Sequence, residues 1–207
     1  KSNIDSNIYD FLVFSVRDIN ECEIPNFIET IGPYSFNFCD NLNKITFQSD
    51  SKLKLIDKYA FANSSIKEIT IPSSVTQLNE RSFSYCKHLF SLGIESNSNL
   101  KIIEKSAFIF SGLREFTAPS SLIEIGDFVF NYTNLGIINF EPRSKLRKIG
   151  RNCFYNCQIE IFDLPSEIVE ICDGTFRSCK KLESFIIPKN SKLKIIGKEA
   201  FSESSIE

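Results

Sequence analysis

The sequence predicts an α/β repeat solenoid in which about eight turns of 22–25 residues stack on one another. Two repeated patterns predict it. One pairs two aliphatic residues with a phenylalanine, and the other places apolar residues at positions one, four and six of a six-residue segment. Both patterns return at regular intervals along the chain. A period of about 20–50 residues indicates stacked repeats rather than one globular core.

The phenylalanine pattern predicts one buried corner in every turn. The segment 100–108 shows it most clearly, with an aliphatic residue, a second one three residues later, and a phenylalanine five residues after that. The phenylalanines are Phe36, Phe61, Phe83, Phe108, Phe130, Phe154, Phe176 and Phe201. Five residues before each lies Ile31, Ile56, Leu78, Ile103, Ile125, Ile149, Ile171 or Ile196. We expect both sets to form columns inside the solenoid.

The six-residue pattern predicts one strand per turn. Its copies are 19–24, 42–47, 66–71, 89–94, 113–118, 135–140, 159–164 and 182–187. Their last four residues alternate in polarity and are rich in β-branched and aromatic types, which is typical of a half-buried strand. Because the same corner and return follow every strand, neighbouring strands must run parallel, in a sheet on the concave face. The few residues after each corner predict a convex side that is 3₁₀-helical, short-helical or irregular.

The chain divides into two parts. Residues 1–18 fit the repeat poorly and are expected to form an irregular N-terminal turn or cap, whereas residues 19–207 form the solenoid. Phe11–Val16 is either a strand of an incomplete first turn or part of that cap. Both ends look cut, so we expect a fragment truncated at each end. Long turns (49–56, 96–103, 142–149, 189–196) alternate with short ones, so the true period is a pair of turns, about 47 residues.

A column of charges accompanies this alternation. Two residues after the aliphatic column, the chain reads Lys58, Glu80, Lys105, Asp127, Arg151, Asp173 and Lys198, which alternate in sign. Equivalent side chains of a solenoid lie in one line, so we expect a ladder of ion pairs along one flank. It would set the register between turns or form a recognition stripe, and each exposed pair would contribute only about 0–1 kcal/mol.

The strand pattern, the corner and a small residue three positions after each phenylalanine together resemble the BspA-like class of leucine-rich repeats. The segments 71–94 and 164–188 carry the resemblance most fully, and it covers about residues 19–207. It implies a leucine-rich repeat solenoid. Members of this family are mostly surface or secreted proteins of bacteria and anaerobic protists, so the resemblance also implies cell adhesion and a cell-surface or secreted location.

Composition and motifs argue against several functions. Lys plus Arg number 24 against 26 Asp plus Glu, so the total charge offers little attraction to nucleic acid or to an anionic membrane. Apolar runs are too short for direct membrane insertion. The GxSxG, GxxxxGK[ST] and HExxH motifs are absent. We therefore expect no enzymatic activity, no cofactor and no metal.

The seven cysteines and the single histidine are expected to be structural. Four cysteines lie three residues after a column phenylalanine, where the other repeats have Ser or Thr: Cys39, Cys86, Cys157 and Cys179. Buried free thiols explain this position, although Cys157 and Cys179 are the pair best placed for a disulfide. Spacings around Cys153 do not match a zinc site. Cys86 beside His88 lacks a third group to orient a catalytic pair.

The outward strand positions are the candidate binding site, because solenoids usually present their concave face to partners. Towards the C-terminal half, apolar residues appear among them with acidic neighbours. The predicted partner-binding residues are Phe90, Ile137, Ile161, Ile186, Glu160, Asp163 and Glu183, with the three isoleucines at the centre. The alternative is that Glu160 and Glu183 cover these isoleucines.

The sequence thus predicts a non-enzymatic interaction module that binds a protein or glycoprotein, with homo-association through the apolar patch as a further use. The alternative is a cytoplasmic structural scaffold, one subunit of a larger assembly. Two sequons make Asn63 and Asn131 candidate glycosylation sites on the convex ridge and favour the surface. Free thiols favour the scaffold. The ligand and the oligomeric state are not written in the sequence.

Overall fold

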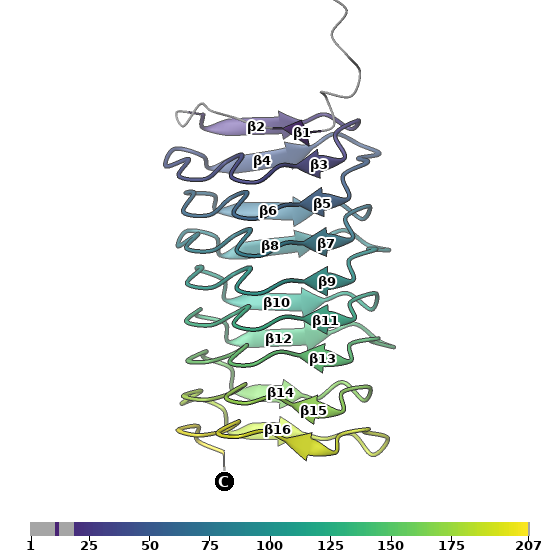
Figure 1. Ribbon diagram of the computed structural model, residues 1–207, viewed down its shortest axis with the longest axis vertical. Helices are drawn as coiled ribbons and strands as arrows, with labels where there is room; N and C mark the ends of the chain where they lie inside the picture. The colour runs from purple at the N-terminus through teal and green to yellow at the C-terminus, as the bar shows by residue number, and fades with distance from the viewer. Residues whose placement is uncertain (1–10, 13–18, 207) are drawn as a thin grey trace, which may run out of the picture.

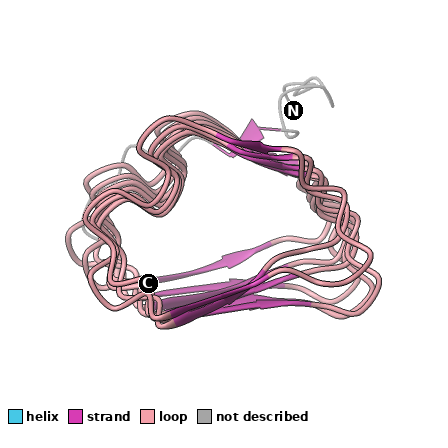
Figure 2. Ribbon diagram, turned by 90° about the horizontal axis from the view of Figure 1, so that it is seen from below, coloured by secondary structure: helices cyan, strands magenta, loops and turns pink. Residues whose placement is uncertain are grey.

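The computed structural model describes residues 11–12 and 19–206, which form one solenoid. Its turns lie one above another (Figure 1), and a view along the stack shows two layers of strands joined by loops (Figure 2). The long strands are β2 (Glu21–Ile24), β4 (Lys44–Phe47), β6 (Glu68–Ile71), β8 (Ser91–Ile94), β10 (Glu115–Ala118), β12 (Ile137–Phe140), β14 (Ile161–Asp163) and β16 (Ser184–Ile186). Each begins at the third residue of a predicted six-residue segment. The eight predicted strands are confirmed, and those that pair run parallel, but they form three sheets (β2–β8, β10–β12 and β14–β16) rather than the one continuous sheet expected.

A second parallel sheet faces the first, and the sequence patterns did not predict it. Its strands have two residues each: β1 (Phe11–Leu12), β3 (Thr30–Ile31), β5 (Leu55–Ile56), β7 (Gln77–Leu78), β9 (Ile102–Ile103), β11 (Glu124–Ile125) and β13 (Lys148–Ile149). Beyond them, β15 (Glu170–Ile171) and β17 (Ile195–Ile196) form a separate two-stranded sheet. From β3 onward, the aliphatic column supplies the second residue of each short strand. Phe11 pairs with Thr30, so β1 adds a strand to this sheet. The rest of the predicted N-terminal turn or cap lies outside the described residues.

The predicted helical convex side is not confirmed, because residues 11–12 and 19–206 contain no helix, and hence none that could cross a membrane. Two residues of every turn, two positions before and two after the column phenylalanine, have positive φ; Tyr34 and Phe38 are the first such pair. Left-handed residues interrupt any helical run. Across this corner every second N–H group donates to the next turn, as Phe36 does to the Ala60 carbonyl at 2.7 Å, and the N–H groups between them donate back to the carbonyl three residues earlier, as Asn37 does to Tyr34.

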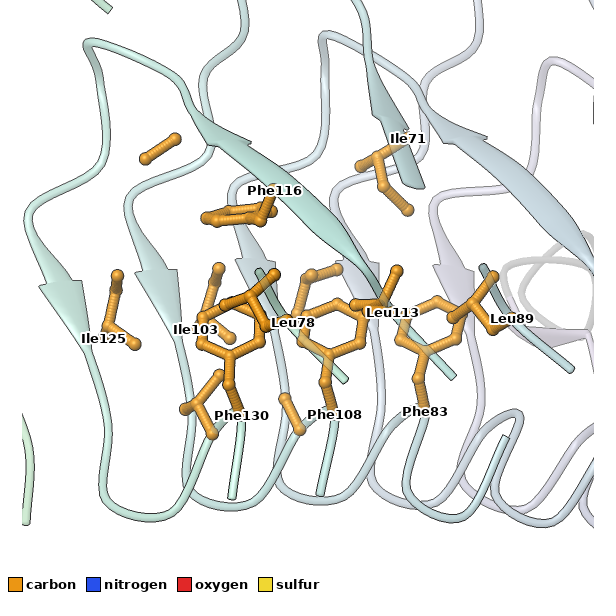
Figure 3. Packing of buried hydrophobic residues seen from close by; sticks show 14 of the residues in the cluster. Ile71, Leu78, Phe83, Leu89, Ile103, Phe108, Leu113, Phe116, Ile125 and Phe130 are labelled. Carbon is orange, nitrogen blue, oxygen red and sulfur yellow. The ribbon is translucent and has the colours of Figure 1, made fainter. Parts of the chain in front are cut away.

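The interior is a ladder of stacked rings. Successive column phenylalanines lie 4.9–5.7 Å apart between ring centroids with nearly parallel planes. Figure 3 shows Phe83, Phe108 and Phe130 in this ladder beside the aliphatic column. All column members are buried through Phe176, whereas Ile196 is 58 % exposed because the described chain has no turn beyond it. Each turn therefore buries its ring only against its two neighbours.

The alternation of turn lengths appears in the long-strand sheet. Strands joined by a short turn form full ladders: β2 with β4, β6 with β8, β10 with β12, and β14 with β16. Strands joined by a long turn separate. β4 and β6 pair only at Lys44 and Glu68, and no ladder joins β8 to β10 or β12 to β14 among the described residues. The predicted two-turn period therefore appears as a row of strand pairs. We call the place where two neighbouring pairs separate a splayed junction.

Candidate interaction surface

Strand alternation decides which side chains face outward from the long-strand sheet. In β12, Ile137 and Asn139 are exposed, whereas Ile138 is buried. β14 repeats this arrangement, with Ile161 and Asp163 outside and Phe162 inside. A shift of one residue would exchange the two faces, so the buried ring of Phe162 fixes Ile161 on the outside.

Ile137 and Ile161 lie together at the splayed junction between β12 and β14. They line one shallow hollow of about 310 Å³, with Glu160 and Asp163 at its rim. Their exposed fractions are 55 % and 57 %. The two glutamates of the predicted site therefore do not cover these isoleucines, and the alternative prediction fails here.

Ile186 completes the patch on the next strand. It is 48 % exposed and lies in register with Asp163, its partner in the β14–β16 ladder. Glu183 donates its N–H to the Glu160 carbonyl at 3.0 Å, so these two residues, which immediately precede β16 and β14, also lie side by side. We call Ile137, Ile161 and Ile186 the isoleucine patch, and Glu160, Asp163 and Glu183 its acidic rim.

Phe90 is not part of this patch. It immediately precedes β8 and is 48 % exposed, but β10 separates that strand from β12. The outward residues of β10 are Glu115 and Thr117, which are polar. The structure thus brings together six of the seven predicted binding residues and leaves Phe90 apart.

The equivalent junction between β4 and β6 has the same opening with different chemistry. Its hollow of about 350 Å³ is lined by Lys44, Glu68 and, further along, Thr46, Thr70 and Gly93. Sequence reasoning missed both hollows because it did not predict that strands separate at the long turns. The hollow at β4–β6 also extends over Gly93 of β8, which has no side chain to fill it. The alternation of long and short turns was the signal that pointed to their positions.

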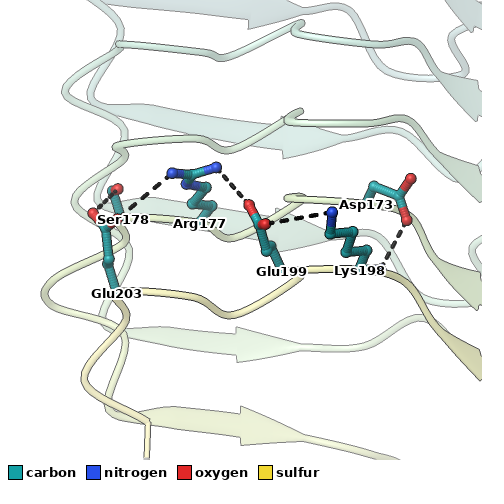
Figure 4. Close-up of polar contacts among 6 residues, drawn as sticks. All are labelled: Asp173, Arg177, Ser178, Lys198, Glu199 and Glu203. Atoms are coloured by element: carbon teal, nitrogen blue, oxygen red, sulfur yellow. Dashed lines mark hydrogen bonds and ion pairs between the residues drawn. The ribbon is translucent and has the colours of Figure 1, made fainter.

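The predicted ladder of ion pairs is wrong. Among the described residues, no ion pair joins two members of the alternating column; instead, Asp127 and Asp173 each accept the backbone N–H of the residue below, Arg151 or Lys198, at 2.8 Å. The Lys198 ammonium reaches Glu199, and Arg177 bridges Glu199 and Glu203 (Figure 4). The repeat alignment still holds, because these backbones lie in register. The aspartate side chain is short, so its carboxylate accepts the backbone N–H of the next turn and does not reach the basic group at the end of that residue's side chain.

The column cysteines are buried, and Cys86, Cys157 and Cys179 are free thiols. Cys86 donates to the Phe61 carbonyl at 2.9 Å, and Cys157 and Cys179 donate to the corresponding carbonyls one turn earlier. Burial raises the pKa of Cys86 to about 12, and that of Cys179 equally. Such thiols remain protonated and unreactive at neutral pH.

His88 is exposed while Cys86 is fully buried, so the two do not form a catalytic pair. The described residues hold no group of three His, Cys, Asp or Glu arranged for a metal.

A row of aromatic residues at the corner escaped the sequence analysis. Tyr85, Phe110 and Tyr132, each two residues after a column phenylalanine, stack on one another with centroids 4.9 Å apart. Tyr85 and Tyr132 are exposed. The signal was available, because the same offset from the phenylalanine column gives an aromatic residue in four turns, beginning with Phe38.

Comparison with known proteins agrees with this architecture. The pneumococcal vaccine antigen PcpA is similar in structure, with a TM-score of 0.64 and 19 % identity over 87 % of this chain and 59 % of its own. A leucine-rich repeat protein of T. pallidum has a TM-score of 0.62 and 19 % identity over 86 % of this chain and 78 % of its own. This chain thus spans less than two thirds of PcpA. No curated relative matches. A family model described as a BspA type leucine-rich repeat region matches residues 6–136 and 101–207. The chain belongs to the BspA-type leucine-rich repeat family.

Proposed function

We propose that this chain is a protein-binding module that holds a protein or glycoprotein ligand against the isoleucine patch. The supporting observation is that three isoleucines on adjacent strands are each 48–57 % exposed. Burying such a side chain contributes about 1.5–3 kcal/mol, so an uncovered cluster favours a partner. The acidic rim favours a ligand with basic groups around an apolar centre.

Adhesion at a cell surface is the role we propose for this binding. Leucine-rich repeat solenoids commonly bind proteins through an extended face, and PcpA is described as a vaccine antigen. The ligand would be a host or matrix protein, with no role for nucleic acid. The buried free thiols favour a second candidate, a cytoplasmic scaffold subunit, because reduced thiols persist in reducing compartments.

Binding without catalysis is part of the proposal. The high pKa of the buried Cys86 and Cys179 thiols leaves them without nucleophilic character at neutral pH. The hollow beside Ile137 and Ile161 is shallow and open, which suits a contact surface better than a reaction chamber.

The test compares two double variants in binding to a panel of purified extracellular-matrix proteins. Ile161→Asp with Ile186→Asp places two charges in the isoleucine patch and should weaken binding at least about 30-fold, since about 2 kcal/mol is lost. Thr46→Asp with Thr70→Asp adds the same charges at the β4–β6 junction and should bind as the wild type. Unchanged binding by a folded Ile161→Asp, Ile186→Asp variant would contradict the proposal.

Self-association through the isoleucine patch is tested in the same samples. Sedimentation velocity over a concentration series should show whether the wild type forms dimers that the Ile161→Asp, Ile186→Asp variant does not. Dimers that persist in this variant would remove the patch as the surface of self-association.

A further inference from the structure

The asparagines of the two sequons occupy repeat positions that differ by one residue, and this difference gives their side chains different environments. Asn63 is the second residue after its column phenylalanine, Phe61, whereas Asn131 is the first after Phe130. Asn63 therefore occupies the left-handed position at the outer corner, with φ of 57°. Asparagine tolerates this conformation better than most residues.

Asn131 is held inside the fold. It is 7 % exposed, and its side-chain Nδ2 donates to the Asn152 carbonyl at 3.3 Å. The hydroxyl of its sequon, on Thr133, is also buried and donates to the Phe130 carbonyl at 2.7 Å. The expectation that both sequons stand clear on a ridge is therefore wrong for Asn131, because a glycan there would displace packed neighbours.

Asn63 has none of these restraints. No hydrogen bond engages its side-chain amide within the described part of the chain, and both it and Ser65, the third residue of the sequon, are only partly buried. Its backbone is fixed, since its N–H donates to the Ser84 carbonyl at 2.9 Å. Among the described residues, the side-chain amide of Asn63 is thus unbonded on a backbone that is held in place.

A gap in the aromatic row surrounds this amide. The turn above places Phe38 at the same position and the turn below places Tyr85, so Asn63 replaces one ring of the row. The two rings are about 10 Å apart, since adjacent turns are spaced by roughly 4.8 Å. They line a hollow of about 270 Å³, with Asp40, Lys87 and His88 at its edge. Phe110 covers the opposite face of Tyr85.

We propose that Asn63 is an N-glycosylation site, that the first sugar of its glycan packs between Phe38 and Tyr85, and that Asn131 remains unmodified. A pyranose ring has apolar C–H faces, which suit two aromatic rings, and polar edges, which suit the charged groups around this hollow. In the modification, Asn63 Nδ2 bonds to the anomeric carbon of a lipid-pyrophosphate-linked oligosaccharide. The bond from that carbon to the pyrophosphate oxygen breaks, the amide loses one proton, and the lipid pyrophosphate leaves. The catalyst is the oligosaccharyltransferase of a secretory pathway.

The experiment secretes the whole chain from a glycosylating eukaryotic host behind a cleavable signal peptide. The folded fraction is analysed by site-resolved mass spectrometry. We expect glycan at Asn63 and a bare Asn131, with Asn63→Gln removing the added mass and Asn131→Gln leaving it. A bare Asn63 in folded, secreted protein overturns the proposal, as does glycan on Asn131 in protein with native circular dichroism. Either result is independent of ligand binding to the isoleucine patch.

Packing of the first sugar is tested separately by thermal unfolding. The glycoprotein, trimmed to one sugar, is compared with Asn63→Gln in three backgrounds. In the wild type the sugar should raise Tm by about 2–4 °C, the shift expected for roughly 1 kcal/mol in a chain of this size. Tyr85→Ala should abolish the increment, whereas Tyr132→Ala, two turns further along the same row, should retain it. An equal increment in both variants would refute the packing.

Discussion

The two halves of the long-strand sheet share one backbone and differ on both faces. From β2 to β8, outward residues such as Glu68 and Thr70 are polar, and the inward second residues are small or aliphatic, Ile45 and Ile69 among them. In the half from β10 to β16, the isoleucine patch lies on the outer face of β12, β14 and β16, while Phe116, Phe162 and Phe185 point inward and contact the phenylalanine column.

This difference separates what the fold requires from what it permits. Inward positions must be apolar in both halves, because each turn is buried only by its neighbours. Outward positions carry no such requirement, as the polar β4–β6 junction shows. The fold therefore does not require isoleucine at the equivalent β12–β14 junction, which supports the proposal that Ile137 and Ile161 contact a partner.

The largest expected effect comes from truncating the ring column in each half. Phe61→Ala should lower the free energy of unfolding by about 3–5 kcal/mol, the usual cost of a large cavity. Phe154→Ala should cost about 1 kcal/mol more, because Phe154 also contacts the strand ring of Phe162, with centroids 5.6 Å apart. Urea unfolding measures both, and a smaller loss at Phe154 would show that the additional rings do not strengthen the C-terminal half.

Alkaline pH should weaken both halves through buried thiols whose pKa is raised, Cys86 in the N-terminal half and Cys153, Cys157 and Cys179 in the C-terminal half. The pKa of Cys86 rises from 9.0 to about 12 in the folded state, so the unfolded chain loses its proton first. Stability is complete below pH 9 and should fall above it by about 1.4 kcal/mol per pH unit for each such thiol. Cys86→Ser and Cys179→Ser should each remove the contribution of one thiol to the pH dependence of the free energy of unfolding, measured by urea titration between pH 8 and 10. Serine already occupies this position in other turns, so both variants should fold.

A smaller effect is expected at two of the short turns, where a glutamate side chain links the paired strands β6–β8 and β10–β12. Glu95 accepts the Ser73 N–H at 2.7 Å, and Glu141 accepts the Ser120 N–H at 2.8 Å, at equivalent positions in the two halves. Glu95→Ala and Glu141→Ala should each cost about 1 kcal/mol, and glutamine at either position should restore most of it. If alanine and glutamine behave identically in urea unfolding, these acceptors do not stabilise the pair.

The smallest effect is expected from exposed ion pairs. Lys54 binds Glu29 in the N-terminal half and Lys192 binds Glu167 in the C-terminal half, each at 2.8 Å. Double-mutant cycles should give coupling energies below about 1 kcal/mol for both, and 0.5 M salt should reduce them. A coupling well above this value in either half would show that surface charge contributes to holding the turns together.

Much of the fold could be predicted from short-range regularities. The spacing of Phe36 to Phe201 gave the turns, and the six-residue segments gave the long strands, because a repeat that buries its apolar face must place the same residue types at the same offsets. The short strands could not be predicted in this way, since two residues carry no period of their own. Their pairing depends on turns already being stacked.

The candidate site divides in a similar manner. Alternation along a strand was enough to place Ile137, Ile161 and Ile186 outside, but not to decide that Phe90 lies apart from them. Phe90 lies apart because β10, with the polar Glu115 and Thr117 on its outer face, lies between β8 and β12. The separation of β12 from β14 at a long turn decides the hollow beside Ile161.

The sequence by itself therefore determined the repeat, the inward columns and the outward isoleucines, because each follows from burial at fixed offsets within one turn. Only the tertiary structure decided the relations between turns: the second sheet, the splayed junctions, the failure of the charge ladder and the different environments of Asn63 and Asn131. Those relations depend on which backbone N–H and carbonyl groups of neighbouring turns come within hydrogen-bonding distance. A repeated residue type at a fixed offset does not specify how far apart two turns lie or in which direction their side chains point.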